Sequence, residues 1–160
     1  MQFTNYFFAS LISFSGLFIG LMLVRIAPEE QKPLQNYFIL AGKSLLLAIF
    51  VFLMFYYSNQ LFYLSTLIGY FIFLIFVEYR VNDPYKKSML AYAVLGALFF
   101  LSMKNTNLFA IEASLILLYG LPAASLLYSR KGKNHRLVLH NLIFLVISNL
   151  LFFTTSHPLF

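Results

Sequence analysis

Long uncharged stretches alternate with short polar connections along the whole of this chain. Residues 3–24 carry no charge, and at ~1.5 Å per helical residue they can cross the ~30 Å hydrocarbon core of a bilayer. Residues 44–77 are also uncharged, but as one helix they would run ~51 Å, so the polar cluster Ser58-Asn59-Gln60 must turn them. The pattern predicts an all-α, polytopic transmembrane helix bundle of six spans, at about 3–25, 37–57, 61–79, 88–103, 108–128 and 137–153.

The positive charges predict how these spans are oriented. Nine of the eleven Lys and Arg residues fall in the first, third and fifth connections: Arg25 with Lys32, Arg80 with Lys86 and Lys87, and Arg130 with Lys131, Lys133 and Arg136. Short loops rich in Lys and Arg stay on the cytoplasmic side of a membrane. We therefore expect both termini outside (N-out/C-out), in a multi-pass protein integral to the cell (plasma) membrane.

The composition indicates that lipid is the main solvent of the chain. Hydrophobic residues make up 61% of it and charged residues 10%, whereas charged residues reach ~25% in soluble domains. We expect a single integral membrane domain over residues 1–160. The absence of cysteine excludes disulfides and thiolate chemistry. The net charge of +6 does not indicate a nucleic-acid partner, because the basic residues lie in the connections.

Three segments that enter the membrane from the outer side resemble one another. Each begins with Ser or Thr followed by Asn and reaches a Phe within four residues: Thr4-Asn5, Ser58-Asn59 and Thr106-Asn107. A repeated helical hairpin of roughly 50 residues would explain this, and the six spans would then form three hairpins. The alternative is that Phe-rich spans with polar ends resemble one another by chance.

Glu112 is a candidate ligand or ion site, because it lies inside the fifth predicted span. An acid there needs a cation or a wet cavity, and it would suit cation binding or proton transfer. The alternative is a pair with Lys104 near the outer interface.

Gly120 and Pro122 lie near the middle of the same span, where proline removes a helical hydrogen bond. A helix break at Gly120–Pro122 would resemble those that line substrate sites in transporters.

Two polar groups are expected on the cytoplasmic side. The first could hold a phosphate or a lipid head group, or could simply neutralise loop charges, and consists of Glu29, Glu30, Lys43, Glu78, Arg80, Arg136 and His140. The second could contact anionic lipid head groups or serve only to fix the topology, and consists of Arg130, Lys131, Lys133 and Arg136.

Gly16 and Gly20 form a GxxxG pair in the first span. Small residues at this spacing let helix backbones approach closely in lipid, either within the bundle or in self-association.

Recognisable catalytic motifs are missing: Asp83 is the only aspartate, and the chain contains no HExxH or GxSxG sequence. We therefore expect no metal site and no cofactor.

The function that these patterns favour is that of a non-catalytic subunit or scaffold of a membrane assembly, with lipid and another membrane protein as partners. One alternative is a small-solute transporter or substrate-capture component, with its site near Glu112 and the Gly120–Pro122 break. The other is a lipid-directed membrane enzyme that uses the cytoplasmic group of Glu, Lys, Arg and His side chains.

Overall fold

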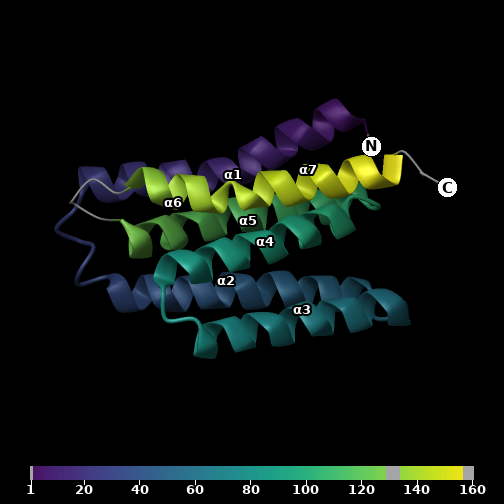
Figure 1. Ribbon diagram of the computed structural model, residues 1–160, viewed down its shortest axis with the longest axis horizontal. Helices are drawn as coiled ribbons and strands as arrows, with labels where there is room; N and C mark the ends of the chain where they lie inside the picture. The colour runs from purple at the N-terminus through teal and green to yellow at the C-terminus, as the bar shows by residue number, and fades with distance from the viewer. Residues whose placement is uncertain (1, 129–133, 157–160) are drawn as a thin grey trace.

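The computed structural model describes residues 2–128 and 134–156, and every regular element within them is a helix. The prediction of an all-α fold is confirmed. The helices lie alongside one another in a bundle (Figure 1). In chain order they are α1 (Phe3–Ile26), α2 (Gln35–Tyr56), α3 (Leu61–Arg80), α4 (Pro84–Ser102), α5 (Thr106–Leu127), α6 (Asn134–Asn141) and α7 (Ile143–Ser156).

Five stretches of these helices are long and apolar enough to cross a membrane: α1, α2, α3, α5 and the segment Asn134–Thr154, which joins α6 to most of α7. The composition is therefore that of a multi-pass membrane protein. The last stretch has an irregularity at Leu142, but the Leu142 amide still donates to the Val138 carbonyl and the Val146 amide to the Leu142 carbonyl. The chain therefore keeps its direction through the irregularity.

The helix α4 is the exception to this hydropathy pattern. Its 19 residues span about 28 Å, but Lys86 and Lys87 in its first turn make it less apolar than the other long helices. It is also the most enclosed helix, since every residue from Val94 to Phe99 is buried. A helix buried on all sides lies inside a bundle, and α4 packs against α3, α5, α6 and α7 (Figure 1).

Side-chain caps fix the starts of α4 and α5. Asp83 accepts a hydrogen bond from the Tyr85 amide at 2.9 Å, and Pro84 follows at the first helical position. Asn105 accepts hydrogen bonds from the amides of Asn107 and Leu108. Between α2 and α3 the chain turns at 58–60.

The helices α1 and α5 make the closest crossing in the bundle. A Cβ atom at Gly16 would lie 1.9 Å from the Leu117 carbonyl oxygen, and one at Gly120 would lie 2.4 Å from the Leu17 amide nitrogen. Gly20 lies against Leu121 and Ala124 of α5. Glycine is required here because backbone contacts backbone. Gly16 and Gly20 are thus covered by α5 and do not form an exposed surface for self-association.

The helix ends that flank the basic connections lie together at one end of the bundle, where α1, α3 and α5 finish and α2, α4 and α6 begin (Figure 1). We call this the basic end. Its described cations include Arg25, Lys32, Arg80, Lys86 and Lys87. The N-terminus of α1 and the C-terminus of α7 lie at the opposite end.

The helix α3 lies at the edge of the bundle beside α2 (Figure 1). Of its 20 residues, only Leu67 and Val77 are buried. Many of its other apolar side chains, such as Phe62 and Phe76, are largely exposed, as expected for a helix that faces lipid, whereas Phe71 and Leu74 are partly buried against the core. This sparse packing leaves a cavity between α3 and the centre of the bundle.

Candidate ligand-binding groove

A groove with a volume of about 670 Å³ lies between α2, α3, α4 and α5. This volume falls within the ~300–1,000 Å³ typical of small-molecule sites. Its walls are mainly apolar side chains from all four helices, including Leu46, Phe50, Phe71, Leu74, Ala91 and Leu126. The shape and lining suit an apolar ligand or the apolar part of an amphipathic one.

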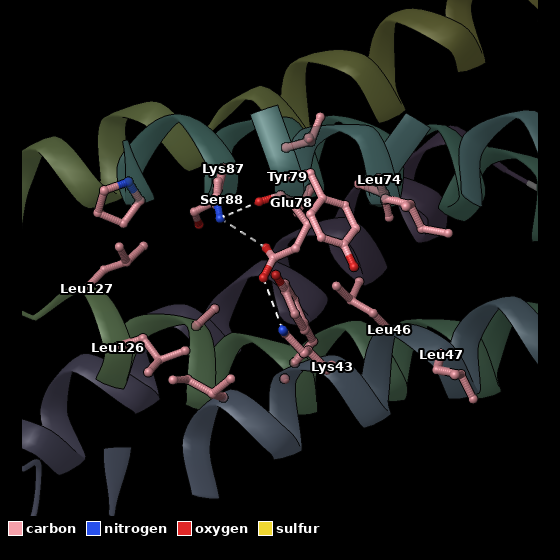
Figure 2. Close-up of a pocket in the computed structure, with 18 of the residues that line it drawn as sticks. Lys43, Leu46, Leu47, Leu74, Glu78, Tyr79, Lys87, Ser88, Leu126 and Leu127 are labelled. Atoms are coloured by element: carbon pink, nitrogen blue, oxygen red, sulfur yellow. Dashed lines mark hydrogen bonds and ion pairs between the residues drawn. The ribbon is translucent and has the colours of Figure 1, made fainter. Parts of the chain in front are cut away.

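Three charged side chains meet partway along the groove, at the level where α3 ends and α4 begins (Figure 2). The Nζ of Lys43 on α2 lies 3.0 Å from Oε1 of Glu78 on α3, and the Nζ of Lys87 on α4 lies 3.3 Å from its Oε2. Figure 2 shows the Glu78 carboxylate between the two lysines. Two positive charges and one negative charge give this part of the groove a net charge of +1. We call Lys43, Glu78 and Lys87 the charged triad.

The lysine ammonium groups are positioned by different means. Lys87 also donates a hydrogen bond of 2.7 Å to the backbone carbonyl of Glu78, so the end of α3 holds it whether or not the carboxylate is nearby. The side chain of Lys43 is 61% exposed, and its one ionic partner in the described chain is the Glu78 carboxylate. Lys43 can therefore move more freely than Lys87.

The floor of the groove is formed partly by α5. A Cβ at Gly42 would lie 3.9 Å from the Tyr119 ring and 4.0 Å from Pro122, so the missing side chain on α2 leaves room beside both. On the α4 side, the buried Ser88 hydroxyl donates to the Asn141 side-chain oxygen at 3.0 Å. That hydrogen bond ties α4 to α6 behind the groove.

The structure brings together only part of the predicted cytoplasmic group. Lys43 and Glu78 meet, but Glu29, Glu30 and Arg80 are exposed and form no ion pair within the described residues. The remaining two members, Arg136 and His140, are on α6, which packs against α4 and α5 rather than α2 or α3. There the Nδ1 of His140 lies 2.7 Å from the Arg136 carbonyl oxygen.

Lys87 is a member of the charged triad that the predicted group did not include. It was identified only as one of the basic residues of the third connection. Its position in the sequence could have indicated this contact. Lys87 follows Glu78 by nine residues, across the short connection at 81–83, and an antiparallel turn of this length brings the two helix ends together. For the second predicted group, Arg136 is exposed at the start of α6, and Arg130, Lys131 and Lys133 lie outside the described residues.

Glu112 lies away from the groove, in the packed interior. Its side chain is 1% exposed, and its Oε1 has no hydrogen-bond partner within the described part of the chain. The predicted pair with Lys104 is wrong, because Lys104 bonds instead to the Tyr63 hydroxyl, with its ammonium group 4.9 Å from the centre of the Tyr63 ring.

The predicted helix break at Gly120–Pro122 is not formed. The helix α5 is continuous from Thr106 to Leu127, with Pro122 inside it. Membrane helices tolerate an internal proline when the surrounding structure accommodates the lost hydrogen bond. Gly120 is used for the contact with α1, and Pro122 packs toward Gly42 of α2. Neither of them lines the groove, and Glu112 does not line it either.

No group of three or more His, Cys, Asp or Glu side chains in residues 2–128 and 134–156 is placed to hold a metal ion. Comparison of this chain with models of protein families, with curated protein sequences and with solved structures found no match.

Proposed function

We propose that this chain is a six-span protein of the cell membrane that binds an anionic amphiphile in the groove and does not convert it chemically. In this proposal the basic end faces the cytoplasm, and both termini lie outside. The gathering of Arg25, Lys32, Arg80, Lys86 and Lys87 at one end supports that orientation. The fourth span is α4, whose length of about 28 Å suffices when Lys86 and Lys87 extend toward the interface.

The observation that carries the ligand assignment is the position of the two lysines. Lys43 and Lys87 come from different helices, yet both ammonium groups reach the same carboxylate inside an otherwise mainly apolar groove. A cationic point beside apolar walls complements a molecule with an anionic head and an apolar tail. Such a molecule would lie with its head at the charged triad, in the half of the bundle toward the basic end, the side on which anionic head groups of the inner leaflet are found.

A binding role is favoured over a catalytic one by the groups that line the groove. A hydrolytic nucleophile needs a base within hydrogen-bond reach. Ser88 is the serine of the described groove lining, and its hydroxyl donates to the amide oxygen of Asn141, which is not a base. Lys43 and Lys87 are both paired with Glu78, so they act as charged anchors.

Ligand binding can be tested with lysine variants of the purified protein in neutral phosphatidylcholine nanodiscs, with retained dioleoyl phosphatidate measured by native mass spectrometry. We expect Lys43→Gln and Lys87→Gln each to lower retention about tenfold, because a charge-assisted contact worth ~1.4 kcal/mol is lost. Lys86→Gln is the matched control, since it removes the same charge one residue away from the groove. Equal loss in all three variants would mean that only overall charge matters, and the site would be rejected.

Orientation can be tested by single-cysteine labelling, because the chain has no cysteine of its own. An impermeant maleimide should label Ser58→Cys in intact cells and Lys133→Cys only after the cells are permeabilised. The reverse pattern would place the basic end outside and contradict the orientation.

A further inference from the structure

The Glu78 carboxylate occupies the position that we assign to the head group of a ligand. Each of its oxygens faces a different lysine, at 3.0 Å from Lys43 and 3.3 Å from Lys87. An anionic head group would offer the same lysines the same kind of acceptor. The protein therefore already carries an anion of its own where the ligand's anion would bind (Figure 2).

This internal anion can leave without dismantling the site. Lys87 keeps its hydrogen bond to the Glu78 backbone carbonyl at 2.7 Å when the carboxylate moves away. The side chains of Lys43 and Glu78 are 61% and 48% exposed, so both have space to move. Ion pairs with this exposure contribute little to stability. Replacing the Glu78 carboxylate by the anionic head group of a ligand therefore costs little free energy.

The groove provides no other acid that could do the same. Glu78 is the only acidic side chain among the described residues that line it. The acid nearest in sequence, Asp83, is engaged as the cap of α4 through its hydrogen bond with the Tyr85 amide. Displacement of Glu78 alone therefore changes the charge offered to a ligand from +1 to +2.

We propose that Glu78 is a built-in competitor of the ligand, and that the ligand is a lipid with a phosphate monoester head group. This inference rests on the proposed function. A phosphate monoester carries between one and two negative charges near neutral pH, so it matches Lys43 and Lys87 once Glu78 has moved aside. A phosphodiester carries only one charge and competes less well with the Glu78 carboxylate.

The test compares Glu78→Gln with the unaltered protein in the same nanodiscs, using dioleoyl phosphatidate and dioleoyl phosphatidylglycerol as probes. We expect the unaltered protein to retain more phosphatidate than phosphatidylglycerol. Glu78→Gln should raise phosphatidate retention at least fivefold, because the competing carboxylate is gone. Glu30→Gln is the control, since it removes an exposed acid at the same end of the bundle but outside the groove.

A second variant keeps the test decisive if Glu78→Gln folds poorly. Glu78→Asp retains the charge but is one methylene shorter, so it cannot reach both lysines and should give a smaller gain. Unchanged or lower retention in both variants would overturn the competitor role. If the lysine variants still lose binding in that case, the proposed function stands and only this inference fails. If no variant differs from the unaltered protein, the proposed function fails as well.

Soluble glycerol 3-phosphate separates a lipid from a free phosphate ester as the source of the head group. We expect it not to displace phosphatidate at equal concentration, because it places nothing in the apolar groove. Displacement at equal concentration would show that the phosphate alone is recognised, and the lipid assignment would be rejected.

Discussion

The crossing of α1 and α5 gives a sharp prediction for Gly16→Ala. The added Cβ would lie 1.9 Å from the Leu117 carbonyl oxygen and 2.7 Å from its carbonyl carbon, whereas ordinary van der Waals contact begins at 3.4 Å. The two helices must therefore separate by about 1.5 Å, the difference between 3.4 and 1.9 Å. Since both contacting atoms belong to backbone, no side chain can rotate to relieve the overlap.

The size of the effect follows from the packing that this separation removes. A gap of ~0.5–1 Å already forfeits a quarter to a half of the dispersion energy between contacting atoms. Overpacked positions in protein cores cost ~1–3 kcal/mol. Gly16→Ala belongs at the upper end of this range, because the closest of the helix crossings must open. We expect a loss of about 3 kcal/mol in the free energy of unfolding.

Gly69→Ala is the matched control. It is the same substitution in another long apolar helix, but no atom from outside the local backbone of α3 lies within 4 Å of the added Cβ. Alanine is a better helix former than glycine by up to ~1 kcal/mol, so this variant should be at least as stable as the unaltered protein. The other glycines of the described residues should fall between these limits in the order of their closest contacts: Gly120 at 2.4 Å, Gly20 at 2.8 Å, Gly96 at 2.9 Å and Gly42 at 3.9 Å.

The assay is reversible unfolding by dodecyl sulfate in mixed micelles, followed by far-UV circular dichroism because the chain contains no tryptophan. The series compares variants in one detergent, so the differences between them carry the result. Equal stability of Gly16→Ala and Gly69→Ala would show that α1 and α5 do not cross at this glycine pair.

Three further predictions use the same unfolding assay. Tyr6→Phe should lower the free energy of unfolding by about 1 kcal/mol, because the Tyr6 hydroxyl donates to the Ser148 carbonyl and ties α1 to α7. Tyr92→Phe should not lower it, because the buried Tyr92 hydroxyl has no partner in the described structure. A stable Tyr6→Phe variant together with a destabilised Tyr92→Phe variant would refute both the Tyr6 hydrogen bond and the lack of a partner for Tyr92. Glu112→Leu should raise stability by roughly 1–3 kcal/mol, since it removes a buried carboxyl oxygen that lacks a described partner, and a loss would reveal an interaction that Glu112 needs. Lys43→Gln should change the free energy of unfolding by less than about 1 kcal/mol, because its ion pair with Glu78 is exposed. A larger change would mean that Lys43 serves folding rather than binding.

The sequence predicted the helical fold because charge and hydropathy act locally. Uncharged stretches and polar connections such as residues 58–60 depend on neighbours in the chain, and the observed helices begin or end near them. Contacts between helices were harder to predict from the sequence. In lipid, apolar faces look alike whether they meet another helix or an acyl chain. The pairing of Gly16 with the backbone at Leu117 was therefore not predictable.

The candidate site shows the same division. Lys43 and Glu78 were recognised as charges near the cytoplasmic interface, but their meeting with Lys87 depends on how α2, α3 and α4 are arranged. Glu112 was recognised as an unusual acid in a span. Its predicted partner was wrong because Lys104 interacts with the phenol ring and hydroxyl of Tyr63, a contact that spacing along the chain does not encode.

The small buried surface of α3 has a consequence for the order in which this protein assembles. With only Leu67 and Val77 enclosed, α3 has little to contribute to the first compact intermediate, whereas α1, α2, α4, α5 and α7 share most of the interior. We expect those five helices to associate early and α3 to dock last, as in the stepwise association of preformed membrane helices. The wall that carries Glu78 is then the final one to arrive, and a lipid already in the unfinished cleft would be enclosed as the wall closes.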